Sequence, residues 1–197
     1  MTSQLHMESI APSYDLSLSQ WFTPPDLSKR IIEWAGVKHG DAVLEPAAGS
    51  GSLVTPALDA GASVKAYEID PRFRRSAKNL DWHCRDFFAF GDPSAGAFGL
   101  YDFAITNPPY ENGNDLKFIE ACTSLAETTI ALTKTSFLQG VERSEKFWKH
   151  WAPTRLALLS SRPKFSGTDG SAKTDFCVFE LKRTNPKPES TKIEWWP

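Results

Sequence analysis

The stretch Asp41–Asp70, DAVLEPAAGSGSLVTPALDAGASVKAYEID, decides the fold of this chain. Its apolar runs, small-residue loop and helix-compatible middle predict a strand, a loop, a helix and a second strand with an acidic end. This order is the βαβ pattern of nucleotide-binding folds. The expected elements are a strand over 41–45, a loop over 46–51, a helix over 52–60 ended by Gly61, and a strand over 63–69.

The loop after the first strand indicates which kind of ligand binds. Small residues such as Gly49 allow close backbone approach, and Glu68 lies 19 positions later, the spacing of a ribose-binding carboxylate. The loop is not G-x-G-x-x-G, has no Walker lysine, and begins with the acidic Glu45. Because a carboxylate there repels a pyrophosphate and attracts a cation, the loop suits an ammonium or sulfonium ligand better than NAD or ATP.

A second signal is Asn107-Pro108-Pro109-Tyr110, which follows the strand-like run 101–106 and precedes a polar loop over 111–114. Two prolines cannot donate backbone hydrogen bonds, so strand pairing stops there. An amide, two carbonyls and an aromatic ring then meet at the edge of a sheet, which suits a planar molecule that carries an amino group. Taken alone, the tetrapeptide is equally consistent with a simple turn at a strand end.

Composition sets the class of protein. The chain has 197 residues, 41% hydrophobic and 23% charged, which is typical of one globular α/β domain. The N-terminus has neither a basic nor an apolar targeting region, and no apolar run reaches about 18 residues, so a cytoplasmic protein without membrane contact is expected. The three cysteines and four histidines show no ligand spacing, so no metal is expected.

Charge is unevenly distributed along the chain. From Gln139 onward there are 11 Lys and Arg against 7 Asp and Glu, a net of +4, whereas the remainder carries −6 and the whole chain −2. A basic C-terminal third is compatible with a polyanionic partner and equally with a solvated surface.

The other segments complete a mostly parallel sheet with seven strands, the last antiparallel. Thr23, Pro25 and Gly36 predict the start and end of a helix over 25–35. The regions expected are an N-terminal arm over 1–19, one domain over 20–182, and an extended tail over 183–197. The further strands expected are 81–85, 101–106, 154–160 and 175–181, the last two as neighbours, and 128–138 is expected to be a strand followed by a loop. Helices are expected over 115–126 and 143–151.

The series LEPAAGSG, YEID, RDFF and NPPY, preceded by QWFTPP, resembles the class I S-adenosylmethionine-dependent methyltransferases. NPPY in particular resembles the enzymes that methylate the N6 amino group of adenine. The resemblance covers residues 20 to 182 and implies a doubly wound Rossmann-like α/β fold with S-adenosylmethionine as cofactor.

The resemblance assigns roles residue by residue. Glu45 and the loop residues would hold the methionine and ribose parts of the cofactor, Glu68 its ribose hydroxyls, and Asp86 with Phe87 its adenine. The cofactor-binding residues implied are Phe22, Thr23, Pro24, Glu45, Ala47, Gly49, Gly51, Glu68, Ile69, Asp86, Phe87 and Asn107.

The catalytic residues implied are Asn107, Pro108, Pro109 and Tyr110. The Asn107 oxygen and the Pro108 carbonyl would accept the two hydrogens of the target amine, and Tyr110 would stack on its ring. The loop 161–174 carries Arg162, Lys164 and Phe165, which suit phosphate contact and base stacking; a hairpin with the ring tucked inward is the alternative.

The sequence therefore predicts a methyltransferase acting on adenine N6 in DNA, either single-stranded or duplex with the base flipped out. No insertion large enough for a target-recognition domain follows NPPY, so specificity is expected to be relaxed, or supplied by the 161–174 loop or a partner. A small enzyme of the phage or restriction-modification kind fits this description. The alternatives are an RNA base methyltransferase (adenine N6 or guanine N2), a protein glutamine methyltransferase, and an inactive cofactor-binding recruitment module.

Overall fold

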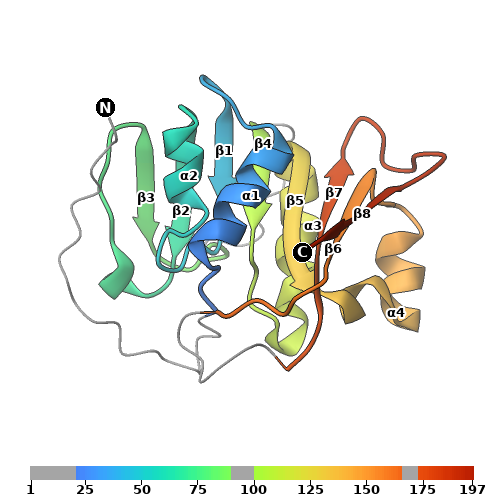
Figure 1. The fold of residues 1–197 in the computed structure, drawn as a ribbon. Helices are drawn as coiled ribbons and strands as arrows, with labels where there is room; N and C mark the ends of the chain where they lie inside the picture. Colours follow the sequence, from blue (N-terminus) through green and yellow to red (C-terminus); the bar gives the residue numbers. More distant parts are fainter. Residues whose placement is uncertain (1–20, 90–99, 166–172) are drawn as a thin grey trace.

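The computed structural model describes residues 21–89, 100–165 and 173–197 and has one eight-stranded sheet, ordered β3-β2-β1-β4-β5-β7-β6-β8 (Figure 1). The expected arm over 1–19 and part of the 161–174 loop lie outside the described residues. The strands are β1 Ala42–Glu45, β2 Ser63–Glu68, β3 Leu80–Cys84, β4 Tyr101–Thr106, β5 Ala126–Lys134, β6 Arg155–Leu159, β7 Phe176–Lys182 and β8 Lys192–Trp196. The helices are α1 Pro25–Ala35, α2 Val54–Asp59, α3 Asn114–Leu125 and α4 Val141–Arg143, with a π-helical turn Ser144–Trp148 and 3₁₀ turns Pro71–Phe73, Glu111–Gly113 and Thr135–Leu138.

The sheet is mostly parallel, as expected. Strand β7 runs antiparallel to both of its neighbours, β5 and β6, which confirms the predicted adjacency of the last two expected strands. The structure adds an eighth strand within the segment expected to be an extended tail, since β8 pairs in parallel with β6. Trp196 at its end is 3% exposed and packs edge-on against Trp34 of α1, so burial of this ring fixes the segment against the sheet.

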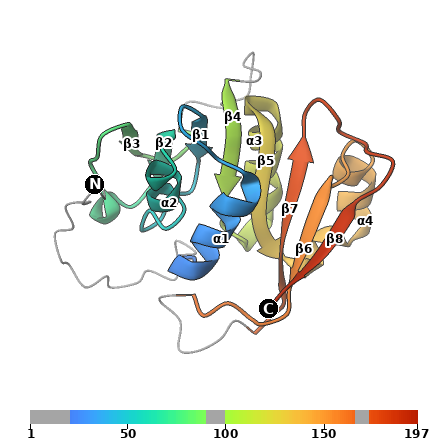
Figure 2. The ribbon, with the colours of Figure 1, turned by 45° about the horizontal axis from the view of Figure 1, so that its top comes forward.

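Helices cover both faces of the sheet, so the domain is doubly wound. Helices α1 and α2 lie on one face, and α3 lies on the other behind β4 and β5 (Figures 1 and 2). The buried residues of α1, including Ile31 and Ile32, share a core with Val43 and Val64 of the sheet. Ala121 and Cys122 of α3 pack in a separate core with Leu44 of β1. Each strand in the middle of the sheet is therefore apolar on both sides, which explains its continuous hydrophobic sequence.

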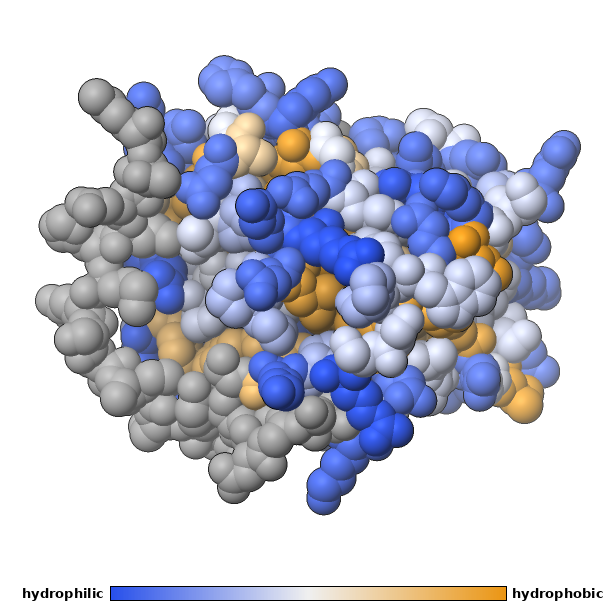
Figure 3. Space-filling model, in the orientation of Figure 1, coloured by the Kyte–Doolittle hydropathy of each residue, from blue (hydrophilic) through white to orange (hydrophobic). Residues whose placement is uncertain are grey.

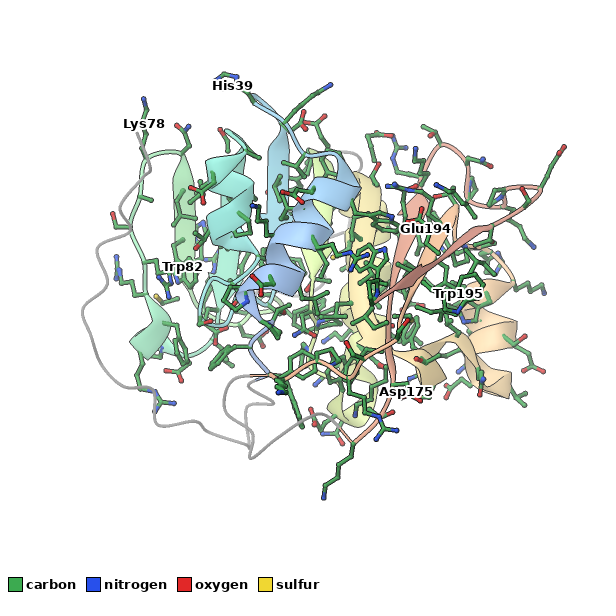
Figure 4. All side chains as sticks on the ribbon, in the orientation of Figure 1. His39, Lys78, Trp82, Asp175, Glu194 and Trp195 are labelled. Carbon is green, nitrogen blue, oxygen red and sulfur yellow. The ribbon has the colours of Figure 1, made fainter. Side chains whose placement is uncertain are left out.

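The strand order reverses between β1 and β4. From β1 the chain proceeds outward to β2 and β3, then crosses back so that β4 pairs with the other side of β1. In open α/β sheets ligands bind outside the carboxyl ends of the strands at such a switch point. Figure 4 labels His39, just before β1, and Asp175, just before the antiparallel β7, at opposite ends of the sheet. The carboxyl ends of β1 and β4 therefore lie at the edge marked by Asp175.

Helix α1 is tied to the far half of the sheet through Arg155 of β6. Nη2 of Arg155 donates to the Trp34 carbonyl (3.0 Å) and to the buried Glu180 carboxylate (2.5 Å). The Arg155 guanidinium also lies 4.0 Å from the Trp34 ring centre. Burial alone would raise the pKa of Glu180, but the hydrogen bonds from Arg155 and Thr154 lower it overall. The last turn of α1 is thereby held against β6 and β7.

The surface seen in Figure 3 is dominated by hydrophilic residues, with apolar residues in small patches between them. None of the helices in the described part of the chain is long and apolar enough to cross a membrane. Among the same residues, no group of three or more His, Cys, Asp or Glu side chains is arranged to hold a metal ion.

Candidate active site

A cavity of about 280 Å³ opens at the carboxyl ends of β1 to β4. It brings together residues that are up to 97 positions apart in the sequence, from Trp21 of the lead-in to α1 to Phe118 of α3. The predicted site residues that line it are Phe22, Ala47, Gly49, Glu68, Ile69, Asp86, Phe87, Asn107 and Pro109.

The glycine loop is shaped by a left-handed backbone and a close ring. Gly49 has φ +52°, and a Cβ there would lie 2.9 Å from the Phe22 ring, so only glycine fits without a shift. Its N–H donates to the Glu68 carboxylate (2.7 Å), which also accepts from the Asp70 N–H (2.8 Å). Burial raises the pKa of Glu68 above its ordinary value. The loop and the end of β2 thus hold each other in place and leave carboxylate lone pairs for a ligand.

Glu45 lies at the bottom of the site, beside a second cavity of about 20 Å³ that it shares with Thr23 and Asn107. It is 2% exposed and accepts a hydrogen bond from the Ala47 N–H (3.0 Å). Burial raises its pKa to about 8, so the side chain is a neutral acid at neutral pH in the ligand-free protein. A cation bound beside it favours the ionised form.

The other end of the cavity is apolar. Phe87 is buried, with its ring centre 5.1 Å from that of Tyr67 and 5.7 Å from that of Phe118, while Ile69 is 53% exposed. The Asp86 carboxylate accepts from the Phe88 N–H (2.9 Å) and keeps further lone pairs. An apolar slot with one carboxylate at its rim suits a flat heterocycle that carries a hydrogen-bond donor.

Asn107 is held in one orientation by the segment that precedes α1. Its Nδ2 donates to the Trp21 carbonyl (2.7 Å) and to Thr23 Oγ1 (3.1 Å), so both amide hydrogens have acceptors. Thr23 is 4% exposed and cannot turn freely towards solvent. These contacts identify Oδ1 as the acceptor end of the amide, and Tyr110 Oη donates to it.

Tyr110 is buried, and its ring is in contact on more than one side. The ring lies edge-on to Phe176 at 5.7 Å between centres, and the Lys134 ammonium sits 4.9 Å from its centre. Burial raises the pKa of its phenol well above the ordinary value, so the hydroxyl is a neutral donor to Asn107. A base that stacks on the face beneath Lys134 must displace this ammonium.

Several predicted residues lie outside the main cavity. Pro24 lines a separate groove together with Arg162 and Lys164, and Pro108 is buried in the loop. Gly51, with φ +81°, lines another cavity beside the Arg75 side chain.

The prediction that the Phe165 ring is exposed for base stacking is wrong. Phe165 is 2% exposed and packs against Trp21 (5.8 Å between ring centres) and Phe176 (5.0 Å). The aromatic residues of neighbouring elements offer this ring an apolar site, so the alternative of a ring tucked inward is the one the structure adopts.

Sequence reasoning missed part of the cavity wall. Tyr67 directly precedes Glu68 at the end of β2, and Trp21 directly precedes Phe22. Both therefore lie next to predicted site residues. Lys117 and Phe118 lie on α3, and only packing of this helix behind β4 brings them to the site, with the Lys117 ammonium 3.8 Å from the Phe88 ring centre. The lining residues not predicted are Trp21, Pro46, Tyr67, Arg85, Phe88, Asn114, Lys117 and Phe118.

Comparison with known proteins agrees with this geometry. Residues 5–68 match the N-6 DNA Methylase family. A ribosomal RNA small subunit methyltransferase of Arabidopsis thaliana is 31% identical over 98 residues, which cover 48% of this chain and 28% of that protein. The chain thus aligns with little more than a quarter of this curated relative.

Solved structures share the fold. A type I restriction-modification methyltransferase subunit from Streptococcus thermophilus superposes with a TM-score of 0.68 over 89% of this chain and 47% of that one, at 14% identity. A dimethyladenosine transferase from Plasmodium falciparum superposes with a TM-score of 0.56 over 82% of this chain and 62% of that one, at 20% identity. The chain therefore shares its fold with these methyltransferases and with a class I S-adenosylmethionine-dependent methyltransferase from Listeria monocytogenes (TM-score 0.64, 14% identity, 90% of this chain and 66% of that one), and it matches the N-6 DNA Methylase family over residues 5–68. S-adenosylmethionine is the cofactor expected from these similarities.

Proposed function

We propose that this protein transfers a methyl group from S-adenosylmethionine to the N6 amino group of adenine in DNA. The observation that carries the proposal is the position of Asn107. Asn107 lines the cavity that follows the Gly49 loop, and its amide is held in one orientation by contacts to Trp21 and Thr23.

The residues present fit the cofactor. In this proposal Glu45 accepts from the ammonium group, Glu68 accepts from the ribose hydroxyls, and the slot around Phe87 takes the purine; these residues line the two adjoining cavities. The missing Cβ of Gly49 lets a ligand and the Phe22 ring approach the same loop. When bound, S-adenosylmethionine supplies a methyl group activated by a sulfonium centre.

The chain itself prepares the amine. The nitrogen of an aromatic amine is a weak nucleophile because its lone pair is delocalised into the ring. Asn107 Oδ1 and the Pro108 carbonyl accept the two amine hydrogens and draw the nitrogen towards tetrahedral geometry, which frees the lone pair for attack. Asn107 Oδ1 accepts a hydrogen bond from Tyr110 with one lone pair and keeps a second lone pair, which can accept one of the two amine hydrogens. The proton leaves to solvent after transfer, so no strong general base is needed.

Relaxed sequence specificity is part of the proposal. Between β4 and β5 the chain forms only the NPPY loop, a 3₁₀ turn and α3, with no inserted recognition domain. Sequence discrimination then falls to surface residues or to a partner subunit. The Streptococcus thermophilus neighbour is a subunit of a type I restriction-modification system, which supports a partner of that kind.

Adenine in RNA is the second candidate substrate. The similarity to the ribosomal RNA methyltransferase of Arabidopsis thaliana favours RNA. The site chemistry proposed at Asn107 is the same for adenine in either nucleic acid. The two candidates differ only in what the surface around the cavity accepts.

The test is transfer of tritiated methyl from S-adenosylmethionine to duplex DNA, single-stranded DNA and RNA in parallel, followed by nucleoside analysis. We expect N6-methyladenine in DNA, and its loss in Asn107→Ala with cofactor affinity nearly unchanged. Asn185→Ala, at an exposed position outside the cavity and without a positive φ, is the matched control and should keep full activity. N6-methyladenine in RNA alone would move the assignment to RNA, and no product on any nucleic acid with the cofactor bound would refute it.

A further inference from the structure

A second groove lies at the same edge of the sheet as the candidate active site. Its volume is about 460 Å³, and it lies between the start of α1, the segment that follows β6 and the end of β8. Strand β6 is antiparallel to β7, which is antiparallel to β5, and β8 is parallel to β6. The carboxyl ends of β6 and β8 therefore point to the same edge as the ends of β1 and β4.

The charged residues of this groove are mostly basic. Arg30, Arg162 and Lys164 line it, against the acidic side chain of Asp26 and the terminal residue Pro197. The main cavity, by contrast, balances Glu68 and Asp86 with two cations. An excess of positive charge in a concave surface attracts an anionic ligand.

Arg30 is held in place by the end of β8, where its Nη1 donates to the Pro197 carbonyl oxygen (3.5 Å). Its guanidinium lies 4.5 Å from the ring centre of Trp196, which is itself 3% exposed and held by Trp34. A guanidinium stacked on a fixed ring has lost much of its freedom before any ligand binds, so little more is lost on binding. Lys164 is exposed, and Arg162 is paired at the surface with Asp175 (Nε to Oδ1 2.9 Å), the residue labelled at this edge in Figure 4.

The groove is joined to the active-site loop by aromatic contacts. Lys164 is followed by Phe165, whose buried ring touches Phe176, and Phe176 in turn packs against Tyr110. Phe165 also packs against Trp21, whose carbonyl holds the Asn107 amide. A strand that lies in the groove is thus one layer of rings away from the site of transfer.

We infer that this groove binds the sugar–phosphate backbone of the nucleic-acid strand that carries the target base, with Arg30 and Lys164 contacting its phosphates. The inference rests on the proposed function and adds the path of the substrate. Phosphate contacts position a strand without reading its sequence, which agrees with relaxed specificity. Arg162, because of its pair with Asp175, is the weaker contact.

The test compares Arg30→Gln/Lys164→Gln with Lys29→Gln. Lys29 neighbours Arg30 on α1 and carries the same charge, but it lines a different cavity and pairs with Glu33 on the surface. Binding of a fluorescent adenine-containing oligonucleotide is measured by anisotropy over a series of KCl concentrations. Methyl transfer is measured on the same oligonucleotide and on an adenine trinucleotide, and cofactor affinity is measured by calorimetry.

Each lost phosphate contact lowers the slope of log affinity against log salt by about 1, so the double variant should lose about 2. The control should keep the slope of the unsubstituted protein. We expect kcat/KM to fall on the oligonucleotide and to stay level on the trinucleotide, with cofactor affinity unchanged. Loss on both substrates in equal measure would instead show damage to the active site and overturn the inference.

The two proposals fail in different ways. If the unsubstituted protein methylates nucleic acid but the double variant keeps the salt slope of Lys29→Gln, the groove is not the backbone path and the proposed function stands. If the unsubstituted protein neither binds nor methylates any nucleic acid, the proposed function and the groove assignment fall together.

Discussion

Replacing Glu45 with glutamine tests the electrostatic account of the site. The carboxyl is 2% exposed, and burial raises its pKa from 4.5 to about 8. A shift of this size, at 1.36 kcal/mol per unit, corresponds to about 5 kcal/mol of stability. The folded state holds a proton that the unfolded state has released between pH 4.5 and 8, so the free energy of unfolding falls as pH rises through that window.

Glutamine at position 45 cannot ionise, so this fall disappears. The difference in unfolding free energy between Glu45→Gln and the unsubstituted protein should shift in favour of the variant by about 5 kcal/mol from pH 4.5 to above pH 8. Urea denaturation at a series of pH values measures it, and other titrating groups cancel in the difference. Glu33→Gln on the exposed side of α1 removes a charge without burial and serves as control.

Cofactor binding should show the opposite dependence on pH. A cationic ligand beside Glu45 favours the ionised carboxylate, so affinity for S-adenosylmethionine should rise as pH rises towards 8, by at most tenfold per pH unit. In Glu45→Gln the contribution of this residue to the pH dependence should be absent. Parallel unfolding profiles of variant and unsubstituted protein across pH 5 to 8 would refute the assignment of a buried neutral acid at this position.

Two further predictions concern the loop geometry. Thr23→Val removes the hydroxyl that accepts from the Asn107 amide, and kcat should fall about tenfold, equivalent to about 1.4 kcal/mol, with a smaller change in cofactor affinity. Thr23→Ser should restore kcat in the same methyl-transfer assay, and equal losses in both variants would contradict this positioning role. Gly49→Ala combines a positive φ with a contact at 2.9 Å, whereas Gly36→Ala has a positive φ and open space. Thermal unfolding should therefore show that Gly49→Ala lowers the free energy of unfolding by about 1–3 kcal/mol, more than Gly36→Ala does. Equal losses would mean that the Phe22 ring moves aside without cost, which would contradict the prediction.

Local sequence patterns predicted the sheet and the cofactor edge because both depend on neighbours along the chain. The apolar runs of β1 and β2, the small loop between them and the proline pair after β4 each specify their own backbone. The carboxyl ends of parallel strands meet at one edge, and there the structure brings Gly49, Glu68 and Asn107 together.

The eighth strand shows where this reasoning stops. KIEWW lies in a polar, proline-containing segment, and its sequence alone does not say that it pairs with β6. Burial of Trp196 against α1 decides the pairing, and α1 lies about 160 residues earlier in the chain. Phe165 is similar, because its exposure depended on whether Trp21 and Phe176 offered it an apolar site.

The sequence by itself determined the order of the elements, the acidic character of the cofactor loop and the amide at the end of β4, since each is encoded within a short stretch. Only the tertiary structure decided that Trp21 and Thr23 hold Asn107, that Glu45 is buried deeply enough to stay neutral, and that a basic groove adjoins the site. These features arise from contacts between segments far apart in the chain. Their strength depends on desolvation and on relative placement, which no local pattern records.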